Sequence, residues 1–262
     1  MKFSVITISF NAASVIGKTI NSVLKQDFSD YEYIFVDGAS KDKTNSIIDS
    51  YKDRFNEKGI TVTHISEPDK GISDGFAKGV CLAKGEIVII LNAADEMLPG
   101  TMSILAEQFD DKTDILYGNI IWHDEARGIE YIKKSKSPEF LEQLKYTMVV
   151  KHPATYIKKA AYEKYGNYDP SFKYAMDTEL LLRMYKQGAR FKYIDHEFTF
   201  FQAGGASDTH LIDGLKEAAR IAREAGENNL QIAVHLTFKY IHHKLAHFIR
   251  FNFMKGKRSN EK

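Results

Sequence analysis

Residues 87–95 read IVIILNAAD and carry the strongest signal for a buried β-strand in this sequence. The first five are apolar and four of them are β-branched, which is typical of a strand covered on both faces. Asn92 and Asp95 follow directly, so the predicted strand ends in polar side chains. Two other apolar runs, at 3–8 and 33–36, end in the same way, in the residues SFN and DGAS.

Segments with the apolar spacing of helices alternate with these strands. Helices are predicted at 15–24, 42–55, 73–83 and 100–109, and further strands at 61–65 and 115–117. This alternation predicts an α/β fold with a mainly parallel, Rossmann-like central sheet flanked by helices. Ligands of such sheets bind at the carboxyl ends of the strands, so the three polar clusters are expected to converge on one edge.

The second half of the chain has a less regular pattern. Residues 119–150 are mixed, the segment MDTELLLRM at 176–184 predicts a helix, and 191–194 predict a strand. The segment GGAS at 204–207 has the composition of a loop, and 211–225 have the pattern of a helix.

The composition is that of a soluble globular protein, with 44% hydrophobic and 27% charged residues and a net charge of +1. This charge balance does not indicate a nucleic-acid-binding protein. The single cysteine, Cys81, cannot form an internal disulfide bond, which fits a reducing compartment. The first residues do not resemble a secretory signal and no apolar run reaches about 18 residues, so a cytoplasmic protein without a membrane-spanning helix is predicted.

The near-neutral charge is the sum of two unequal parts. Residues 235–262 contain seven Lys and Arg and one Glu, so the rest of the chain is acidic. Apolar residues at 238, 241, 245 and 248 fall at helical spacing among these cations, which predicts a basic amphipathic helix. Such a helix suits a membrane surface, here through 235–258, or packs on the rest of the chain or on a second subunit. His242, His243 and His247 lie in the same segment, without a carboxylate or cysteine to suggest a metal site.

Several common phosphate-binding and catalytic motifs do not occur. No GxGxxG follows the first strand, and GxxxxGK[ST], CxxC and HExxH are missing. What the pattern predicts instead is a crevice lined by carboxylates at the edge of the sheet. Such a crevice suits Mg²⁺ or Mn²⁺ bridging a diphosphate, because these ions prefer oxygen ligands from one or two carboxylates plus phosphates.

Six segments in order resemble the inverting family 2 glycosyltransferases, which have the GT-A fold, and together they cover about residues 2–207. They are SVITISFNAASVIGKTINSVLKQ, YIFVDGASKDKT, SEPDKGISDGFAKG, GEIVIILNAADEMLPG, HPATYIKKAAYEKYGNYD and YAMDTELLLR. The resemblance implies a GT-A catalytic domain at 1–225, with nucleotide-sugar binding in about 1–118 and the acceptor side in about 119–225. Residues 226–262 then form the amphipathic tail.

The resemblance also implies a set of donor-binding residues. Phe10 matches an aromatic residue near the nucleotide base, with Ser9 and Asn11 beside it, and Asp37 matches an acid that contacts base or ribose. Glu67, Asp69 and Lys70, in EPDKG, resemble the donor-binding loop. Simpler readings stay open, because Phe10 could be a core aromatic, Asp37-Gly38 a turn, and EPDKG a solvated turn.

Asp95 matches the last acid of the family's DxD-like motif, so the resemblance implies that it holds Mn²⁺ or Mg²⁺ against the donor diphosphate. The chain departs from the pattern one residue earlier, where Ala94 replaces the first acid. A methyl group can neither accept a hydrogen bond nor bind a metal. The chain therefore either relies on Asp95 alone or is impaired, and weakened binding of donor or metal is expected in both cases.

Asp177 matches the family's acid at the start of the acceptor-side helix, and the resemblance implies that it is the catalytic base. The alternative is that it only stabilises the helix N-terminus. Glu179 and His152, the latter in a matching His-Pro pair, are expected on the acceptor or substrate side. His152 could equally be a structural, hydrogen-bonded histidine.

The sequence thus predicts an inverting glycosyltransferase that moves a sugar from a nucleotide-diphosphate donor, with a UDP-sugar favoured, to an acceptor hydroxyl. The acceptor expected is a saccharide, in particular a lipid-linked one of O-antigen or capsule assembly, which fits peripheral association with the inner face of the cell membrane. The alternatives are an impaired variant or nucleotide-sugar-binding protein, suggested by Ala94, and a nucleotidyltransferase. The last is disfavoured because ISFNA at 8–12 lacks a basic glycine-rich loop. The oligomeric state stays open.

Overall fold

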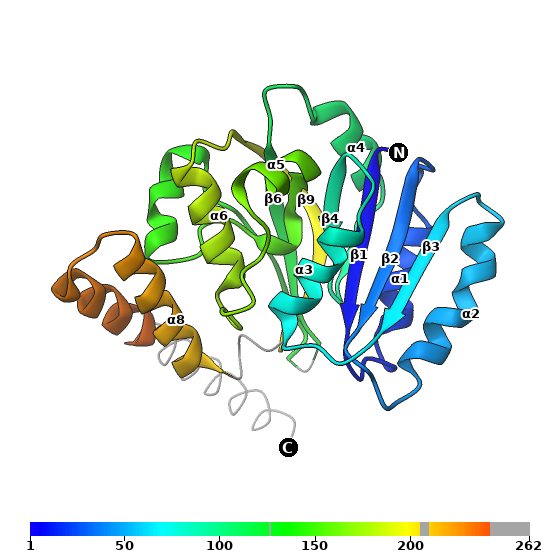
Figure 1. The fold of residues 1–262 in the computed structure, drawn as a ribbon, viewed down its shortest axis with the longest axis horizontal. Helices are drawn as coiled ribbons and strands as arrows, with labels where there is room; N and C mark the ends of the chain where they lie inside the picture. The colour runs from blue at the N-terminus through cyan, green and yellow to red at the C-terminus, as the bar shows by residue number, and fades with distance from the viewer. Residues whose placement is uncertain (126, 205–209, 242–262) are drawn as a thin grey trace, which may run out of the picture.

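The computed structural model describes residues 1–125, 127–204 and 210–241. A nine-stranded sheet runs through the molecule in the order β3-β2-β1-β4-β8-β6-β9-β5, with β7 beside β6 (Figure 1). Its first four strands are parallel and lie next to one another: β1 (Phe3–Ser9), β2 (Tyr31–Asp37), β3 (Thr61–Ser66) and β4 (Ile87–Ile90). The predicted parallel sheet is therefore confirmed in the first half of the chain.

The second half extends the same sheet and adds antiparallel pairings. Strand β8 (Thr155–Lys158) runs antiparallel between β4 and β6 (Ile115–Asp124), and β9 (Phe191–Gln202) runs parallel to β6. Two short strands, β5 (Glu96–Met97) and β7 (Ile129–Lys133), pair with β9 and β6. Strands β6 and β9 are longer than predicted, because polar residues such as Asn119 and Asp195 interrupt their apolar pattern while the two strands remain paired.

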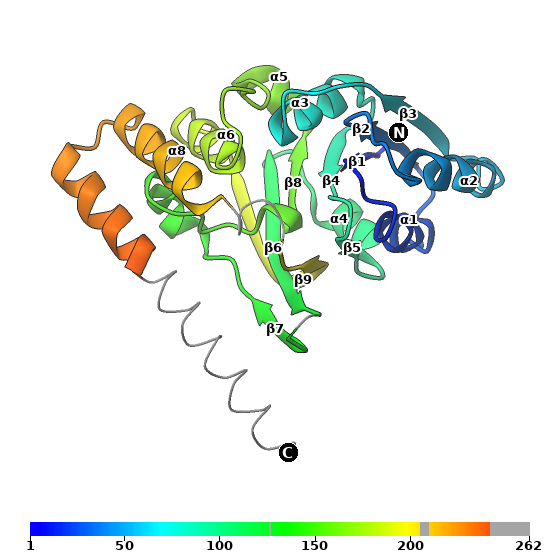
Figure 2. The same cartoon turned by 90° about the horizontal axis from the view of Figure 1, so that it is seen from below.

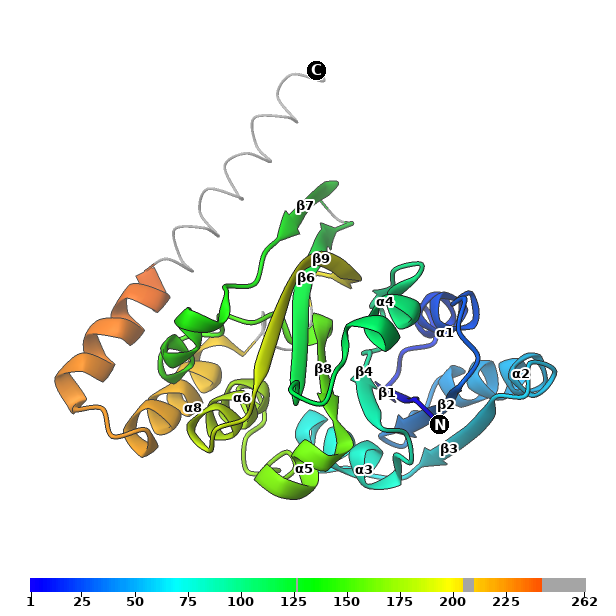
Figure 3. The same ribbon diagram turned by 90° about the horizontal axis from the view of Figure 1, so that it is seen from above.

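Helices cover both faces of the sheet (Figures 2 and 3). One face packs against α1 (Ile16–Leu24), α2 (Thr44–Asn56) and α4 (Thr101–Gln108). The other packs against α3 (Ile72–Leu82), α5 (Lys159–Tyr165), α6 (Met176–Lys186) and the short 3₁₀ helix η1 (Pro138–Lys145). Helix α8 (Leu211–Glu224) lies beside α6. The helices predicted from apolar spacing agree with these bounds to within two residues, which confirms the α/β class. Three elements were not predicted: η1, α5 and the 3₁₀ turn η2 (His152–Ala154).

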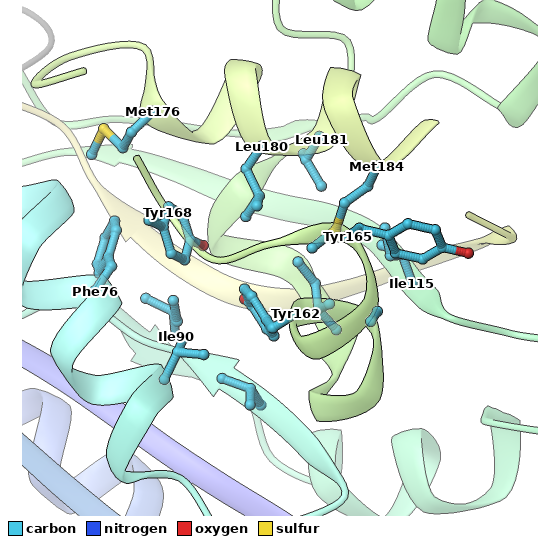
Figure 4. Packing of buried hydrophobic residues seen from close by; sticks show 14 of the residues in the cluster. Phe76, Ile90, Ile115, Tyr162, Tyr165, Tyr168, Met176, Leu180, Leu181 and Met184 are labelled. Atoms are coloured by element: carbon cyan, nitrogen blue, oxygen red, sulfur yellow. The ribbon is translucent and has the colours of Figure 1, made fainter. Parts of the chain in front are cut away.

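The packing of α6 fixes where its N-terminus lies. Leu180, Leu181 and Met184 are fully buried and face the sheet with Tyr162 and Tyr165 (Figure 4). Burying each such aliphatic side chain contributes about 1.5–3 kcal/mol, so the helix is held firmly against the core. Its first turn is thereby placed next to the end of the sheet where the strands β1–β4 terminate.

Helix α3 approaches the sheet through a glycine. A Cβ atom added at Gly79 would lie well inside van der Waals distance of Ile6 Cγ2, and Ile6 is fully buried in β1. We expect Gly79→Ala to lower the free energy of unfolding by about 1–3 kcal/mol, because overpacking forces a shift of side chain or backbone. Denaturant unfolding measures this change.

Gly214, in the interior of α8, provides the matched control. A Cβ there meets only Tyr174 Cβ at 3.8 Å, an ordinary contact. Gly214→Ala is therefore expected to raise the free energy of unfolding by up to about 1 kcal/mol through helix propensity alone. Equal effects of the two substitutions would show that the close approach of α3 to β1 does not matter for stability.

Of the predicted tail, residues 229–241 are described and form a helix. Ile232 is buried, the rings of His235 and Tyr146 stack with centroids 3.7 Å apart, and the Tyr146 hydroxyl donates to Glu227 Oε2 over 2.5 Å. The start of the tail thus packs on η1. This agrees with the predicted alternative in which the tail packs on the rest of the chain. The three histidines at 242, 243 and 247 and the loop residues 205–207 lie outside the described residues. Within the described part, no helix is both long and apolar enough to span a membrane.

Candidate active site

The carboxyl ends of β1, β2 and β4 carry unusual backbone conformations. Within the described residues, only three residues other than glycine have positive φ: Asn11 (49°), Ala39 (60°) and Ala94 (90°). Each follows one of these three neighbouring strands. Backbone conformations of this kind cost about 1–3 kcal/mol each and cluster at functional sites. The convergence of the three loops on one edge, predicted from the sequence, is confirmed (Figure 2).

Asp37, at the end of β2, is fully buried and accepts five hydrogen bonds. Oδ1 accepts from the hydroxyls of Ser9 (2.9 Å) and Ser40 (2.5 Å). Oδ2 accepts from the Ser40 amide (2.8 Å), Ser66 Oγ (2.7 Å) and Asn45 Nδ2 (3.1 Å). Burial alone would raise the pKa of this carboxyl group, but the bonds from Ser40, Ser66 and Asn45 outweigh it and hold the pKa below its ordinary value. A direct contact with base or ribose therefore requires one of these donors to be displaced.

The bonds to Asp37 also predict a change in stability. Asp37→Asn is expected to lower the free energy of unfolding by about 1–3 kcal/mol at pH 7, because buried donors lose their ionised acceptor. The pKa of Asp37 is lower in the folded state than in the unfolded state. Its contribution to the free energy of unfolding is therefore complete above the unfolded pKa of about 3.9, and it is lost as the pH falls through the pKa of the folded state. The difference between wild type and Asp37→Asn in urea unfolding should therefore shrink below about pH 4.

Asp49→Asn is the control for Asp37→Asn. Asp49 is exposed and pairs with Lys52 and His64 at the surface. Its substitution should change stability by less than about 1 kcal/mol. If Asp37→Asn lowers the free energy of unfolding no more than Asp49→Asn does, the hydrogen bonds to the buried Asp37 carboxylate do not stabilise the fold as proposed.

The loop after β1 is tied to the loop after β2. The Asn11 amide donates to Ser40 Oγ over 2.7 Å, and Asn11 Oδ1 accepts from the Lys41 amide over 2.9 Å. Phe10 directly precedes Asn11 in the loop after β1 and is 65% exposed. The alternative prediction that Phe10 is a core aromatic residue is therefore wrong. A Cβ at Gly38 would lie 3.4 Å from the Phe10 ring and 2.7 Å from Asp69 Oδ2, so the ring and the carboxylate both lie close to the backbone at Gly38. An exposed ring of this kind can stack on a nucleobase.

The segment EPDKG links β3 to α3 and is exposed. Glu67 pairs with Lys78 over 2.8 Å, and Asp69 Oδ1 accepts from the Gly71 amide over 2.9 Å. The Lys70 amide donates to Asp74 Oδ2 over 3.1 Å. The loop is therefore ordered by its own carboxylates, with Asp69 next to Gly38.

Asp95, after β4, is 3% exposed. Its Oδ1 accepts from the Gln202 amide of β9 over 3.1 Å, and its Oδ2 lies 3.5 Å from Asn92 Nδ2. Burial raises the pKa of Asp95 to about 7, against the lowering effect of these two bonds. Ala94 beside it donates its amide to Thr19 Oγ1 over 3.0 Å, and its methyl group can neither accept a hydrogen bond nor bind a metal.

The residues around Asp95 fit a divalent cation. Asn92 Oδ1 is buried and accepts no hydrogen bond from any residue in the described ranges, so an oxygen ligand next to Asp95 lacks a partner. Oxygen ligands of this type suit Mg²⁺ and Mn²⁺. The described residues contain no group of three His, Cys, Asp or Glu that could hold a metal by themselves, so diphosphate oxygens would have to complete the coordination.

Asp177 lies in the first turn of α6, the helix start fixed by packing. Its Oδ1 accepts from the amide and hydroxyl of Thr178 (2.7 and 3.3 Å). The amides that precede the helix are bound instead by Glu217 of α8, which accepts from Lys173, Tyr174 and Ala175 over 2.8 Å each. Glu217 therefore stabilises the residues that lead into α6, while Asp177 binds an amide of the first turn itself. Glu217 could not be predicted from the sequence, because it lies 40 residues from Asp177 and belongs to another helix.

His152 and Tyr168 lie close enough to Asp177 to sense its charge. Burial lowers the pKa of His152, and the Asp177 carboxylate opposes this shift. His152 Nε2 and the Tyr168 hydroxyl share a hydrogen bond of 2.8 Å, and the His152 ring lies tilted by 35° against the ring of Phe76, with centroids 5.5 Å apart. His152 is thus a buried, hydrogen-bonded histidine, as the structural alternative predicted. It nevertheless lies near enough to Asp177 for the two charges to interact.

Glu179 points away from this group. Both of its carboxylate oxygens bind Arg183, over 2.6 and 3.0 Å, and Arg183 also donates to the carbonyls of Tyr165 and Asn167. The ion pair thus ties α6 to the segment after α5. A contact of Glu179 with acceptor stays a prediction, and its carboxylate is already engaged.

Carboxylates and an aromatic ring at the carboxyl edge of a parallel sheet are typical of α/β enzymes, whose ligands bind at that edge. Within that class the chain belongs to one family. The model of glycosyl transferase family 2 matches residues 4–168, so the chain is a family 2 glycosyltransferase, as the sequence motifs suggested.

Curated relatives carry the same description. A PGL/p-HBAD biosynthesis glycosyltransferase of Mycobacterium bovis is 24% identical over 212 residues, 79% of both chains. An uncharacterised glycosyltransferase of Mycobacterium tuberculosis is 29% identical over 184 residues, 69% of this chain and 67% of that one.

Solved structures confirm the GT-A fold. S. aureus TarS matches 90% of this chain with a TM-score of 0.66 and 22% identity, and the chain spans only 41% of TarS. A TarS 1–349 complex with UDP-GlcNAc matches with a TM-score of 0.64 at 21% identity, over 90% of this chain and 70% of that one. The mannosyltransferase PcManGT of Pyrobaculum calidifontis, in complex with GDP-Man and Mn²⁺, matches with 0.61 at 17% identity, over 84% and 64%.

Proposed function

We propose that this glycosyltransferase transfers a sugar with inversion from a nucleotide-diphosphate donor, a UDP-sugar in particular, to an acceptor hydroxyl. The observation that carries the proposal is the arrangement of two groups at one edge of the sheet. Phe10, Asp69 and Asp95 lie on the loops after β1, β3 and β4, while Asp177 lies at the start of α6 next to His152. The first group suits a donor and the second suits an acceptor.

On the donor side, the exposed Phe10 ring stacks on the base, and the lack of a side chain at Gly38 lets Phe10 and Asp69 lie close to the loop after β2. Ser9, Asn11 and Asp37 act as positioning residues, because their hydrogen bonds hold the two loops in place. Glu67 and Lys70 frame the same crevice from the EPDKG loop. Solved structures of similar fold hold UDP-GlcNAc in one case and GDP-Man in another, which supports a nucleotide-sugar donor and leaves the base to experiment.

On the acceptor side, Asp177 takes the proton of the acceptor hydroxyl as that oxygen attacks the anomeric carbon. A new carbon–oxygen bond forms on the face opposite the leaving group, and the bond to the diphosphate breaks, which releases a nucleoside diphosphate and inverts the anomeric centre. General-base catalysis of this kind contributes about 10²–10⁴ in rate. Asp95, with Asn92, would hold Mn²⁺ or Mg²⁺, which supplies Lewis-acid stabilisation of the leaving diphosphate when bound.

Ala94 supports a second candidate function, a nucleotide-sugar-binding protein or impaired enzyme. The missing acid weakens the donor side without touching Asp177. Hydrolysis of a nucleotide sugar by the purified chain would decide between the two functions, since only an active transferase turns the donor over.

We further propose that the acceptor is a saccharide attached to a membrane lipid, as in assembly of a bacterial surface polysaccharide. The tail supports this proposal, because Leu230, Val234 and Phe238 are 76%, 47% and 72% exposed at helical spacing on 229–241. Flotation of the full chain with vesicles of phosphatidylcholine and phosphatidylglycerol should show binding that Phe238→Ser weakens. If equal amounts of the protein float with and without vesicles, peripheral membrane association is excluded.

The donor proposal is tested by a thermal-shift screen of UDP-, GDP- and dTDP-sugars with Mn²⁺. A ligand that binds only the folded state raises its stability by about 2.7 kcal/mol at 100 times its dissociation constant, which a melting curve detects. One UDP-sugar is expected to give the largest shift, and chelation of Mn²⁺ should remove it. A larger shift with a GDP- or dTDP-sugar would overturn the choice of base.

A further inference from the structure

Glu217 lies on α8 and binds the segment that leads into α6. One carboxylate oxygen accepts from the Lys173 amide, and the other accepts from the amides of Tyr174 and Ala175, over 2.8 Å each. Consecutive backbone amides that bind one anion form a nest, and hydrogen bonds to a charged acceptor are about twice as strong as neutral ones. An acidic side chain from another helix therefore helps to determine the conformation of residues 173–175.

This segment leads directly to the proposed base. Ala175 is the residue before α6, and its carbonyl accepts from the Glu179 amide over 3.0 Å, in the bond that begins the helix. Asp177 follows two residues later. The side chains of α6 that are completely buried begin about one turn further on, at Leu180. The position of the first turn therefore depends on the preceding segment as well as on the core.

Helix α8 makes further contacts with the same segment, and the two helices lie side by side (Figure 2). Arg220 Nη1 donates to Ser171 Oγ over 2.9 Å, and the Arg220 guanidinium group lies 4.0 Å from the centroid of the buried Phe172 ring. The rings of Tyr174 and His210, the residue before α8, stack with centroids 4.8 Å apart. Contacts from α8 thus hold the segment from Ser171 to Ala175.

The other end of this segment contacts the donor side of the site. Ser73 lies in the first turn of α3, directly after the EPDKG loop, and is buried. Its hydroxyl donates to the carbonyl of Asp169 over 2.8 Å. Residues 169–175 are therefore bonded to the donor-side helix α3 at one end and to Glu217 at the other, just before Asp177. The placement of Asp177 relative to the donor loop depends on this connection.

We propose that Glu217 is a positioning residue for sugar transfer, which holds Asp177 where it can take the proton of the attacking hydroxyl. The inference rests on the proposed function for the role of Asp177. Displacement of a reacting group by about 1 Å can lower a rate about 10²-fold. Glutamine at position 217 has the size of glutamate but an NH₂ group in place of one acceptor oxygen, so at least one of the three bonds is lost.

The coupling between Glu217 and Asp177 can be tested without donor or turnover, in the full chain labelled with ¹⁵N. In Glu217→Gln we expect the amide signals of residues 173–175 to move, and with them the signal of the Thr178 amide, which donates to Asp177 Oδ1. Ile221→Val is the matched control, because it loosens the buried face of α8 and leaves the carboxylate in place. In that variant the Thr178 signal should stay where it is in the wild type.

The effect on the reaction is measured as release of UDP from the UDP-sugar with the largest thermal shift, with Mn²⁺ present and water in place of the acceptor. Glu217→Gln is expected to lower kcat about 10- to 100-fold, because the base is displaced. KM for the donor should stay within about twofold of the wild type, since the loops that bind the donor are unchanged. Ile221→Val should keep kcat within about twofold, even where its melting temperature falls as far as that of Glu217→Gln.

Three outcomes would overturn the inference. The first is a kcat of Glu217→Gln within twofold of the wild type while the signals of residues 173–175 move. The second is an equal loss of kcat in Glu217→Gln and Ile221→Val, which would show a general effect of stability. The third is an unmoved Thr178 signal in Glu217→Gln. If the wild type releases no UDP, the proposed function fails, and the Thr178 signal still decides whether Glu217 positions the first turn of α6.

Discussion

Asp177→Asn is expected to reduce sugar transfer by about 10³-fold or more while leaving donor affinity within about twofold of wild type. Asparagine keeps the size of the side chain and can still accept the bond from the Thr178 amide, so the first turn of α6 stays in place. What is lost is the ability to take a proton from the acceptor hydroxyl. The measurement is release of nucleoside diphosphate at saturating donor, alongside calorimetric titration of the donor.

Asp213→Asn separates this role from a purely helical one. Asp213 also lies in the first turn of a helix, α8, where it is exposed and pairs with Lys216. If Asp177 only stabilised a helix N-terminus, both variants would lose about 0.3–1 kcal/mol of stability and keep their turnover. Near-normal turnover by Asp177→Asn would rule out its assignment as the base.

Ala94→Asp is expected to raise the Mn²⁺-dependent affinity for the nucleotide sugar about tenfold, which corresponds to about 1.4 kcal/mol. Two effects act in the same direction. Aspartate tolerates a positive φ better than alanine does, and Ala94 has a φ of 90°. In addition, a second carboxylate next to Asp95 gives the crevice another ligand for a cation or for the ribose hydroxyls.

Ala94→Asn is the matched control, because it eases the backbone in the same way without adding a charge. Its affinity for the donor should lie between those of the wild type and Ala94→Asp, and its dependence on Mn²⁺ should match the wild type. Calorimetric titrations with and without chelator give both quantities. If Ala94→Asp binds the nucleotide sugar no more tightly than the wild type does, Asp95 alone is sufficient for donor binding and Ala94 does not weaken it.

The fold was largely predictable because its first half is built from local patterns. The buried run at 87–91 and the strands at 3–8 and 33–36 appear in the structure with their ends within two residues. Strands β6 and β9 extend well beyond their apolar cores, because each is stabilised by pairing with the other rather than by its own sequence. Pairing of this kind joins residues about 75 positions apart and leaves no local pattern.

The positions of the candidate site residues in the fold could be predicted from the sequence, but their contacts could not, and their roles stay predictions. Family motifs located Asp37, Asp95 and Asp177, and the structure places each of them at the same edge of the sheet. They could not show that Asp37 would be saturated by serine and asparagine donors, nor that Glu217 would stabilise the start of α6 from another helix. Those contacts depend on tertiary packing.

The most direct test of the donor site is a calorimetric titration of UDP into wild type and Asp95→Asn, with Mn²⁺ and with chelator. Asparagine is nearly isosteric and can keep the bond from the Gln202 amide, so the fold should persist. We predict binding that requires Mn²⁺ in the wild type and is at least about tenfold weaker in Asp95→Asn, a loss of about 1.4 kcal/mol. Equal affinity of the two proteins, or tight binding in chelator, would contradict a metal–diphosphate site at the end of β4.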